Sequence, residues 1–512
     1  TVDLFFINFP YYPERYSLVE PDGNRYTYHE DRGFLQAEDP NGNTITFNHD
    51  GLTQSAGLGL AFQRDGQGRI ISMTGPEGGQ WLYTYDPDGN LSTSTDPDGN
   101  TTTYQYLADP AHYLSEIIDP LGRTPVRYEY DPETGRLVAQ VDAKGNRTEV
   151  SWDPSGFAGS RTSPRGFTST VRYDARGNIL EETDHGGNKT TYAYDDPDNP
   201  DRETSITDAD GHTWTFQYNA MGLPTRINPP EVSPATSLLR EYDAFGNVTS
   251  AREFDGALSR FDYDERGNLT RLEPAHGSHM TVNRTPEGMP KTVTLDEVYS
   301  TYFETSATGQ LAGLTDSFGY RADIELDGRG RVKSVTDDQG RTSEFAFNSA
   351  GVPTMQKDFS GNVTTTVETS YGEYATTSPS GAPSCVILDA NGRPASSTIR
   401  SGGTVTPVFD ASGNLESLTD ALANTTSYSY DYAERLLTTT NPNGGVTTNT
   451  YNAVGLLATS ATASGKKRSF TYDAMGRLTA ERWHAPDDSI FRTITFIYNV
   501  NGYLQTVEAV SY

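Results

Sequence analysis

Residues 85–106, YDPDGNLSTSTDPDGNTTTYQY, contain the pattern that decides the fold. Tyr85 is followed at once by an aspartate, four residues later by Gly89, and then by an asparagine and a leucine. A second turn sequence begins at Asp96, and the stretch ends in an aromatic-x-aromatic triplet. Proline presets φ at about −65°, glycine accepts positive φ, and Asp or Asn bonds its own backbone, so both motifs predict turns. The stretch therefore predicts two short strands joined by turns.

The same unit recurs along the chain with a step of about 21 residues. Its aromatic position falls at Tyr85, Tyr106, Tyr130, Trp152, Tyr173, Tyr194, Tyr218, Tyr242, Tyr263, Arg284, Thr305, Leu326, Phe347, Glu368, Leu388, Phe409, Tyr430, Tyr451, Tyr472 and Tyr498. Several units have lost the aromatic residue but keep the glycine four residues on, at Gly288, Gly309, Gly330, Gly351 and Gly392. Degenerate units near Tyr28, Phe47 and Phe62 bring the total to about 23 units, which indicates a tandem array.

The residues between the turns have the pattern of β-strands. Tyr104 and Tyr106 alternate with a period of two and so face the same side, and threonine dominates the flanks. No convincing helical period occurs. Two strands per unit give about 46 strands, or a sheet roughly 220 Å wide, which must coil or close because strands twist. The expected fold class is all-β, with tandem hairpins forming one continuous spiralling sheet that is hollow like a shell or cocoon.

The composition fits a single-layer sheet. Of the 512 residues, 34% are hydrophobic and 11% are aromatic. The aromatic share is too high for a disordered chain, and the hydrophobic share is low for a chain with a large packed core. A one-layer sheet with a solvated outer face and a partly polar interior explains both values. A packed two-layer sandwich is the alternative.

Charge and cysteine content narrow the possible partners. The formal net charge of −30 repels polyanions, so we expect no nucleic-acid partner. Either a solvated surface or an acidic lumen that favours a basic cargo fits this charge. The one cysteine, Cys385, excludes an intrachain disulfide, and no apolar run is long enough for a membrane span. The apolar stretch Leu4–Phe9 is interpreted as a strand or plug and not as a signal peptide.

A family resemblance rests on the best-kept units. Residues 173–178, 263–268 and 472–477 read YDARGN, YDERGN and YDAMGR. Together with residues 85–106 they resemble the YD repeat of Rhs proteins, over roughly residues 20–512. The resemblance implies a β-sheet ribbon that spirals into a hollow cocoon. In bacterial Rhs proteins and insecticidal toxin-complex C proteins such a shell encloses a toxic C-terminal domain, and in teneurins a similar shell serves adhesion at the cell surface.

The chain departs from that family pattern in two ways. We recognise no C-terminal core with the aspartyl self-cleavage motif and no variable toxin after it. The array also stops within a unit, because Leu504–Tyr512 supplies a first strand without a partner, and an unpaired edge favours aggregation. We therefore expect a fragment of a longer polypeptide, or an array capped by something else.

Three motifs could carry chemistry, and each has a simpler interpretation. Asp96 and Asp119 each begin an Asp-Pro-x-Gly element that resembles the paired self-cleavage motif, but their spacing is that of the repeat, which favours turns. The loop Asp86–Asn90 lacks the alternating oxygen ligands and distal glutamate of an EF-hand calcium site. His276–Met280 could be a metal pair or a cloning remnant, but the repeat continues through it, which favours a native turn. We therefore predict no catalytic, cofactor-binding or metal-binding residue, and no cofactor.

These observations lead to one main hypothesis and one alternative. Residues 28–512 are expected to form a repeat shell of about 23 units, after an N-terminal strand or plug segment at residues 1–27. The main hypothesis is a structural shell, not an enzyme, that encloses and protects a toxic C-terminal cargo in a polymorphic toxin system. Its partners would be the cargo or adjoining domains of the same polypeptide. The alternative is an extracellular adhesin or glycan-binding scaffold that binds a cell-surface glycan or protein through exposed aromatic ladders. Both place the protein outside a bacterial cell or on its surface.

Overall fold

The computed structural model describes residues 14–76, 78–230, 237–254, 256–306, 309–348, 351–370, 372–381, 383–399, 401–499 and 503–512. These residues form strands and turns, and none of them lies in a helix that could cross a bilayer. Across them 47 strands are found, against about 46 expected from the repeat count. The all-β prediction is confirmed.

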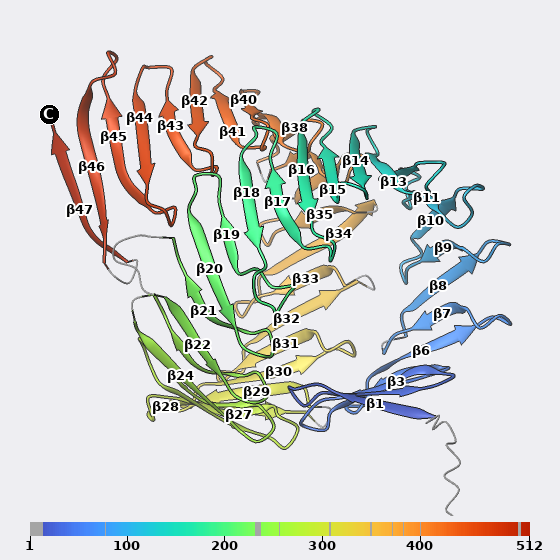
Figure 1. Ribbon diagram of the computed structural model, residues 1–512. Coiled ribbons are helices and arrows are strands. Elements are labelled where there is room, and N and C mark those ends of the chain that lie inside the picture. Colours follow the sequence, from blue (N-terminus) through green and yellow to red (C-terminus); the bar gives the residue numbers. More distant parts are fainter. Residues whose placement is uncertain are drawn as a thin grey trace, which may run out of the picture. The chain divides into compact units, whose positions relative to one another are not determined.

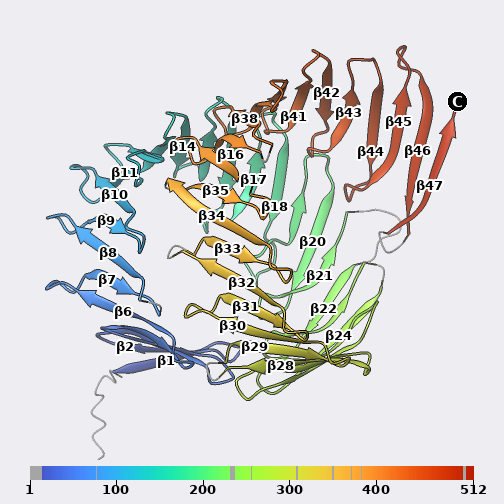
Figure 2. The same ribbon diagram turned by 180° about the vertical axis from the view of Figure 1, so that it is seen from behind.

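The strands pair antiparallel with their neighbours in chain order and belong to one sheet (Figure 1 and Figure 2). Among the described residues the buried apolar side chains are small or medium in size, and no large side chain is fully buried. The buried apolar residues are Ala139, Val141, Ala251, Val282 and Ala480. This sparse burial fits a single-layer sheet and contradicts the packed sandwich.

The chain divides into two compact units, each discontinuous in sequence. Unit 1 contains residues 1–82, 242–250 and 259–344, and unit 2 contains residues 83–241, 251–258 and 345–512. The strands β8 (Gln80–Tyr85), β22 (Leu238–Tyr242), β23 (Val248–Arg252), β24 (Leu258–Tyr263) and β32 (Thr342–Phe347) contain the boundaries between the units.

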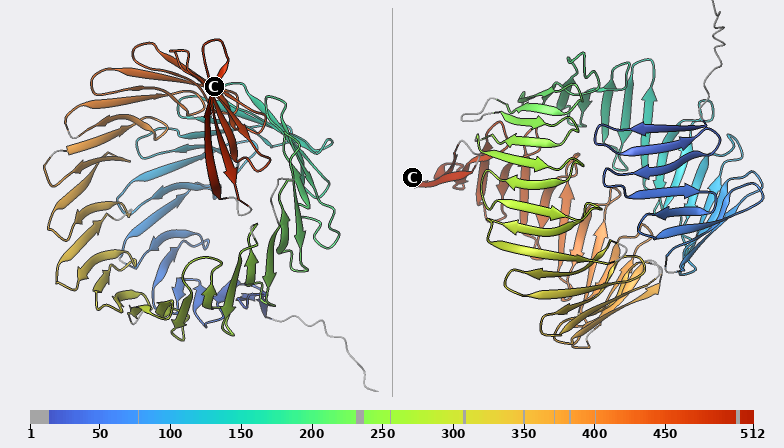
Figure 3. Two further views of the ribbon diagram at one scale, coloured as in Figure 1. Left: turned by 90° about the vertical axis from the view of Figure 1, so that its left-hand side faces the viewer. Right: turned by 90° about the horizontal axis from the view of Figure 1, so that it is seen from below.

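Unit 1 otherwise consists of two runs of strands, and Figure 3 shows their hairpins following one another in chain order. They are β1 (Arg15–Val19), β2 (Arg25–His29), β3 (Gly33–Glu38), β4 (Thr44–Asn48), β5 (Gly51–Gln54), β6 (Gly59–Arg64), β7 (Ile70–Thr74), β25 (Leu269–Glu273), β26 (Met280–Arg284), β27 (Pro290–Leu295), β28 (Tyr299–Thr305), β29 (Leu311–Asp316), β30 (Arg321–Leu326) and β31 (Val332–Asp337).

Unit 2 also consists of two runs. The first contains β9 (Leu91–Thr95), β10 (Thr101–Tyr106), β11 (Leu114–Ile118), β12 (Val126–Tyr130), β13 (Leu137–Asp142), β14 (Arg147–Asp153), β15 (Ala158–Thr162), β16 (Thr168–Tyr173), β17 (Ile179–Thr183), β18 (Lys189–Ala193), β19 (Ser205–Thr207), β20 (Thr213–Tyr218) and β21 (Pro224–Asn228). The second contains β33 (Pro353–Lys357), β34 (Val363–Ser370), β35 (Glu373–Thr377), β36 (Pro383–Leu388), β37 (Pro394–Thr398), β38 (Thr404–Phe409), β39 (Leu415–Thr419), β40 (Thr425–Tyr430), β41 (Leu436–Thr440), β42 (Val446–Tyr451), β43 (Leu457–Ala461), β44 (Lys467–Tyr472), β45 (Leu478–His484), β46 (Ile490–Tyr498) and β47 (Leu504–Ser511).

Two expectations about the ends of the chain have different outcomes. The interpretation of Leu4–Phe9 as a strand or plug lies outside the described residues, and the first described strand, β1, pairs with β2. The expectation that Leu504–Tyr512 lacks a partner is wrong, because β47 pairs antiparallel with β46.

Two kinds of turn alternate along the ribbon. The YD turn follows an aromatic strand end, as at residues 86–90, and the linking turn joins the two strands that come next, as at residues 96–100. In the YD turn the Gly89 N–H donates to the Asp86 carbonyl at 3.1 Å, and Gly89 has φ +89°. Positive φ suits glycine because it has no Cβ, and the pattern is that of a hairpin loop with a G1 bulge. The turns predicted from the sequence are confirmed.

Where a turn begins with aspartate, its side chain closes the turn on itself. Asp86 Oδ1 accepts from the backbone N–H of Asn90 at 2.8 Å, and Oδ2 accepts from the Asn90 side-chain amide at 2.9 Å. Where arginine replaces the asparagine, as at Arg435, its Nε donates to Asp431 Oδ2 at 2.8 Å. The Asn90 side-chain bond lowers the pKa of Asp86, so this acceptor stays ionised at neutral pH.

The next aromatic residue of the repeat packs against this turn. The Arg435 guanidinium lies 4.7 Å from the centre of the Tyr451 ring, and the Tyr451 hydroxyl donates to the Leu436 carbonyl at 2.7 Å. The hydroxyl bond to an upstream carbonyl recurs at Tyr130, Tyr218, Tyr263, Tyr430, Tyr472 and Tyr498. Burial raises the pKa of Tyr451, which keeps this donor protonated. The aromatic residue therefore holds its own hairpin in register.

Among the described residues, three turns have a residue other than glycine in the left-handed conformation at the position that corresponds to Gly89. Ala423, Glu434 and Asp488 adopt φ values of +64°, +61° and +64°. A side chain costs about 1–2 kcal/mol in this region, because Cβ approaches the following carbonyl oxygen. These turns are therefore strained relative to their glycine-containing neighbours.

Ala423→Gly and Glu434→Gly should each stabilise their turn by about 0.5–1 kcal/mol, because relief of Cβ strain outweighs the extra unfolded-chain entropy of glycine. Gly476→Ala should destabilise its turn. Amide hydrogen exchange in the flanking strands measures each change locally, since a long repeat array need not unfold in one step. Unchanged protection of β40 and β41 in the Glu434→Gly variant would contradict the strain.

Candidate functional site

Within each unit, two stretches that are far apart in sequence meet through their turns. Hydrogen bonds join residues that are 227 to 266 positions apart. In all of these contacts a linking turn of the earlier stretch meets a YD turn, or the aromatic residue just before it, in the later stretch. We call this line of contact the seam. It is the candidate functional site, because it joins one pass of the ribbon to another.

In unit 1 a pair of amides closes the seam. Asn41 Nδ2 donates to Asn268 Oδ1 at 3.1 Å, and Asn268 Nδ2 donates to Asn41 Oδ1 at 2.8 Å. Asn43 Nδ2 donates to the Glu287 carbonyl at 3.0 Å. Gly288 is required here for space as well as for its φ of +83°, because a Cβ would come within 2.6 Å of the Asn41 side chain.

In unit 2 charged side chains converge on the YD turn that begins at Asp389. Lys144 Nζ lies 2.7 Å from Asp389 Oδ2, and Arg123 Nη1 donates to the Asp389 carbonyl at 3.1 Å. In the opposite direction, Asn391 Nδ2 donates to Asp142 Oδ2 at 2.6 Å. Both turns thus supply donors and acceptors across the seam.

Asp389 is the most strongly perturbed carboxylate of this contact. Burial opposes its ionisation, but the bond from Lys144, the backbone N–H groups of the turn and the charge of Arg393 outweigh that effect. Together they lower the pKa of Asp389 to about 2. The contact therefore depends on an ionised aspartate.

Farther along unit 2, Arg165 donates to the end of an aromatic strand. Its Nη2 bonds to the Tyr430 carbonyl at 2.6 Å, and its Nη1 bonds to the Asp431 carbonyl at 3.2 Å. Asp410 Oδ2 lies 3.8 Å from the guanidinium, and the Phe167 ring lies 4.8 Å from it. One arginine therefore holds two backbone carbonyls of a turn that is more than 260 residues away.

The adjoining contact packs an aromatic ring against a glycine. The Tyr432 hydroxyl accepts from Asn188 Nδ2 at 2.8 Å, and the His185 ring lies 5.9 Å from the Tyr432 ring. A Cβ on Gly186 would come within 2.5 Å of the Tyr432 hydroxyl oxygen. A glycine in the linking turn thus makes room for an aromatic residue of the YD turn.

The third and fifth residues of the linking turn face the seam. The residues at the third position that contact the opposite turn, or line the space next to it, are Asn41 in unit 1 and Lys144, Arg165, Gly186 and Asp210 in unit 2. The fifth residues that bond across the seam are Asn43, Arg123 and Asn188. Sequence reasoning did not find these residues, because the third position is occupied by many residue types and the stretch that it meets is hundreds of residues away.

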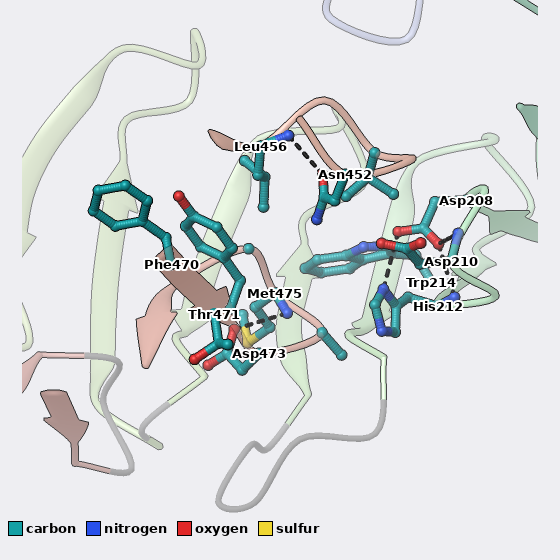
Figure 4. Close-up of a pocket in the computed structure, with 14 residues that line it drawn as sticks. Asp208, Asp210, His212, Trp214, Asn452, Leu456, Phe470, Thr471, Asp473 and Met475 are labelled. Atoms are coloured by element: carbon teal, nitrogen blue, oxygen red, sulfur yellow. Dashed lines mark hydrogen bonds and ion pairs between the residues drawn. The ribbon is translucent and has the colours of Figure 1, made fainter. Parts of the chain in front are cut away.

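Part of the unit 2 seam is open. A cleft of about 480 Å³ lies there, and Figure 4 shows the Trp214 ring between the side chains of Asn452 and Met475. His212 Nδ1 lies 3.1 Å from Asp208 Oδ2 within the same linking turn. Among the described residues no group of three or more His, Cys, Asp or Glu side chains could hold a metal ion. The cleft lies between the linking turn 208–212 and the YD turn 473–477.

The motifs singled out in the sequence are turns. Asp96 Oδ1 accepts from the Asn100 N–H at 2.9 Å, and Arg123 Nε donates to Asp119 Oδ2 at 2.5 Å, so each aspartate serves its own turn. The loop Asp86–Asn90 is closed in the same way. In His276–Met280, the His279 N–H donates to Asp296 Oδ1 at 2.8 Å, in the link between β25 and β26. That the chain has no catalytic, cofactor-binding or metal-binding residue stays a prediction.

The glycan-binding alternative depends on outward-facing aromatic ladders. The repeat tyrosines Tyr263, Tyr430 and Tyr472 are only partly exposed, and their hydroxyls donate to backbone carbonyls of their own hairpins. Burial raises the pKa of each of them. These residues serve the fold, and the alternative stays a prediction without an observation that favours it.

Comparison with known proteins supports the family resemblance. The sequence profile described as RHS Repeat matches residues 64–101, 85–124, 108–147, 173–200, 201–231, 409–446 and 451–482. The chain is 24% identical over 230 residues to the Probable deoxyribonuclease RhsB of Dickeya dadantii, and 29% identical over 201 residues to the Toxin protein Tse5 of Pseudomonas aeruginosa. These alignments cover 41% and 30% of this chain and 15% of each relative, so the chain spans a small part of their length.

The fold also has a counterpart among solved structures. The crystal structure of TcdB2-TccC3-TEV matches with a TM-score of 0.53 and 13% sequence identity, over 97% of this chain and 36% of that chain. At this identity the match establishes the fold alone. The resemblance inferred from the YD pattern is confirmed.

Arg165→Ala should open the seam locally. Loss of the charge-assisted bonds to two carbonyls should lower the local free energy of opening by about 1.5–3 kcal/mol. This corresponds to a loss of about tenfold or more in protection against amide exchange. Amide hydrogen exchange should therefore speed up both near residue 165 and in the turn 431–435. Arg176, the exposed third residue of a YD turn, is the matched control, and Arg176→Ala should leave both regions unchanged. Faster exchange near residue 165 alone would contradict a contact across the seam.

Acid should open the contact at Asp389. Its folded pKa of about 2 lies below the ordinary value of 3.8, so the stability it contributes is present above pH 3.8 and lost as the pH falls through 2. Exchange of the turn 142–146, corrected for the intrinsic rate, should rise over this window. Asp389→Asn should reduce the dependence, and the part that remains should come from Asp142, whose pKa is also lowered by its bonds within the turn and from Asn391. Asp358→Asn is the control, because the pKa of Asp358 is lowered by the Asn362 side chain of its own exposed turn. If Asp389→Asn and Asp358→Asn had equal effects on the exchange of the turn 142–146, the assignment of this pH dependence to Asp389 would be contradicted.

Proposed function

Because the chain is an RHS-repeat protein, we propose that residues 28–512 form part of the wall of a shell that encloses and protects a toxic cargo. The observation that carries this proposal is the seam. Hydrogen bonds and ion pairs between turns let one ribbon of short hairpins build a wall taller than a single hairpin. In this proposal residues 1–27 form an N-terminal strand or plug segment that precedes the repeat wall.

The physical basis of protection is exclusion. Proteases bind an extended segment of substrate whose backbone groups are available, and a ladder of paired strands leaves few such groups. The turns are the remaining sites at which a protease could act. Their own aspartates accept from backbone N–H groups, and residues from across the seam donate to backbone carbonyls. Satisfied backbone groups resist local opening.

The charge and the relatives bear on the cargo. A net charge of −30 placed largely in turns favours a basic cargo over an acidic one. The bacterial relatives named as a toxin and as a probable deoxyribonuclease support a toxic cargo and export from a bacterial cell. In this proposal the chemistry of the toxin resides outside the repeat wall, and the wall itself is not an enzyme.

The test is protease protection of the natural full-length polypeptide that contains this chain. Proteinase K should leave the cargo domain intact for much longer than the isolated cargo domain, as followed by mass spectrometry. Arg165→Glu, which places like charges against Asp410, should make the cargo accessible, and Arg176→Glu should not. Equal digestion rates for enclosed and isolated cargo would refute the proposal.

A further inference from the structure

The cleft in the unit 2 seam has the character of a binding site. It is lined by the turns 208–212, 452–456 and 473–477 and by the ring of Trp214 (Figure 4). Its volume of about 480 Å³ is within the range of small-ligand sites in proteins. Among the described residues that line it are three aspartates, and none of them is a lysine or an arginine. The cleft therefore offers acceptors and an aromatic ring without a cation of its own.

Two repeat units earlier, Arg165 fills the equivalent place in the seam. Its guanidinium donates to the Tyr430 carbonyl at 2.6 Å and to the Asp431 carbonyl at 3.2 Å. The Phe167 ring lies 4.8 Å from this guanidinium, and Asp410 Oδ2 lies 3.8 Å from it. This contact is thus built from two carbonyls, a carboxylate and an aromatic ring around one guanidinium group.

The cleft repeats these acceptors, but an anion stands where the cation should be. Asp210 is the third residue of its linking turn, which is the position of Arg165. Tyr472 and Asp473 stand at the positions of the two residues whose carbonyls Arg165 binds, and both line the cleft. Because Asp210 and Asp473 carry the same charge, Asp210 cannot bridge the seam as Arg165 does. Trp214 supplies the aromatic ring. The cleft is therefore a guanidinium receptor that lacks its arginine.

The other carboxylates of the cleft are engaged in their own turns. Asp208 accepts from the His212 N–H at 2.8 Å, and Asp473 accepts from Arg477 Nε at 2.6 Å. Asp210 is exposed, and its carboxylate makes no hydrogen bond or ion pair with a described residue. A ligand that enters the cleft therefore meets one uncompensated negative charge beside an indole ring.

We propose that this cleft binds the guanidinium group of an arginine side chain from another polypeptide segment. The group stacks on Trp214, pairs with Asp210 and donates to the turn that begins at Asp473. A guanidinium suits the site better than an ammonium, because its planar fork reaches two acceptors while its flat face stacks on indole. The cleft is larger than the guanidinium group, and Val454 and Leu456 offer apolar contact to the stem of the side chain. This binding goes beyond the enclosure function and does not depend on it.

Saturation-transfer NMR of the whole chain with the blocked tripeptide acetyl-Gly-Arg-Gly-amide tests the site. The tripeptide should bind reversibly, and replacing its arginine by lysine should weaken binding about fivefold or more. Citrulline in place of the arginine should abolish binding, because it keeps the shape of the side chain and removes the charge. Propylguanidinium should bind more weakly than the tripeptide. If it bound as tightly, the site would belong to a free guanidinium compound, and the assignment to a polypeptide would be wrong.

Variants of the cleft separate this site from attraction to the overall charge. Asp210→Asn and Trp214→Leu should each weaken tripeptide binding about tenfold or more. Asp338→Asn is the matched control, because Asp338 is an exposed aspartate of a linking turn that does not line the cleft, and its loss changes the net charge of −30 equally. Circular dichroism checks that each variant is folded. Equal effects of Asp210→Asn and Asp338→Asn would reject the proposal.

Asp210→Arg gives an independent readout, since it places a guanidinium of the chain itself at the position of Arg165. This variant should lose tripeptide binding, and amide exchange in the turn 473–477 should slow about tenfold because the cleft is filled from within. Asp210→Lys should slow the exchange less. Tripeptide binding that persists in the Asp210→Arg variant, or unchanged exchange in the turn 473–477, would overturn the proposal.

Discussion

The fold depends on one short-range interaction, the bonding of an aspartate carboxylate to its own turn. In the turn 86–90 the Asp86 carboxylate accepts from a backbone N–H and from the Asn90 amide, while Gly89 supplies the left-handed residue that closes the loop. A three-residue loop with a G1 bulge fixes both the register of the strands and the local twist of the hairpin. Repetition of this turn at both edges of the ribbon replaces the large core that the chain does not have.

The aromatic residue and the arginine of the repeat connect one turn to the next. Arg435 bonds to Asp431 in its own turn and also lies over the Tyr451 ring, whose hydroxyl bonds back to Leu436. Contacts of this kind contribute about 0.5–1 kcal/mol each, which is small for one unit and large over a whole array. Stability in such a protein is a sum over neighbours, which explains how units that have lost the aromatic residue persist between intact ones.

The hairpins could be predicted from the sequence because their cause is local. The spacing from Tyr85 to Gly89, the proline and glycine positions and the alternation in residues 104–106 specify two strands and two turns within one unit. Two strands per unit, multiplied by the number of units, then give nearly the observed number of strands. The expectation of a glycine at the left-handed position of each turn has a local exception at Glu434, which adopts the conformation of glycine at a cost in strain.

The seam could not be predicted, because its cause is the accumulated geometry of many hairpins. Whether Arg165 meets the turn at Asp431 depends on how far the ribbon turns over more than 260 residues, and no residue pattern records that distance. Lys144 and Arg165 look like ordinary exposed turn residues in the sequence. Their partners become visible only when the two stretches are brought together in space.

The choice of partner atoms explains why such a seam tolerates sequence change. Arg165, Arg123 and Asn43 all donate to backbone carbonyls, which every residue type offers. The position of those carbonyls is set by the aspartate and glycine of the receiving turn, so the repeat motif prepares the seam at each unit without specifying the other side chains. A fold held in this way needs only the turn residues to persist, in keeping with a match to a solved structure at 13% identity. What distinguishes one contact of the seam from the next is then the third residue of the linking turn, which is Asn41 in unit 1 and Lys144, Arg165 or Gly186 in unit 2.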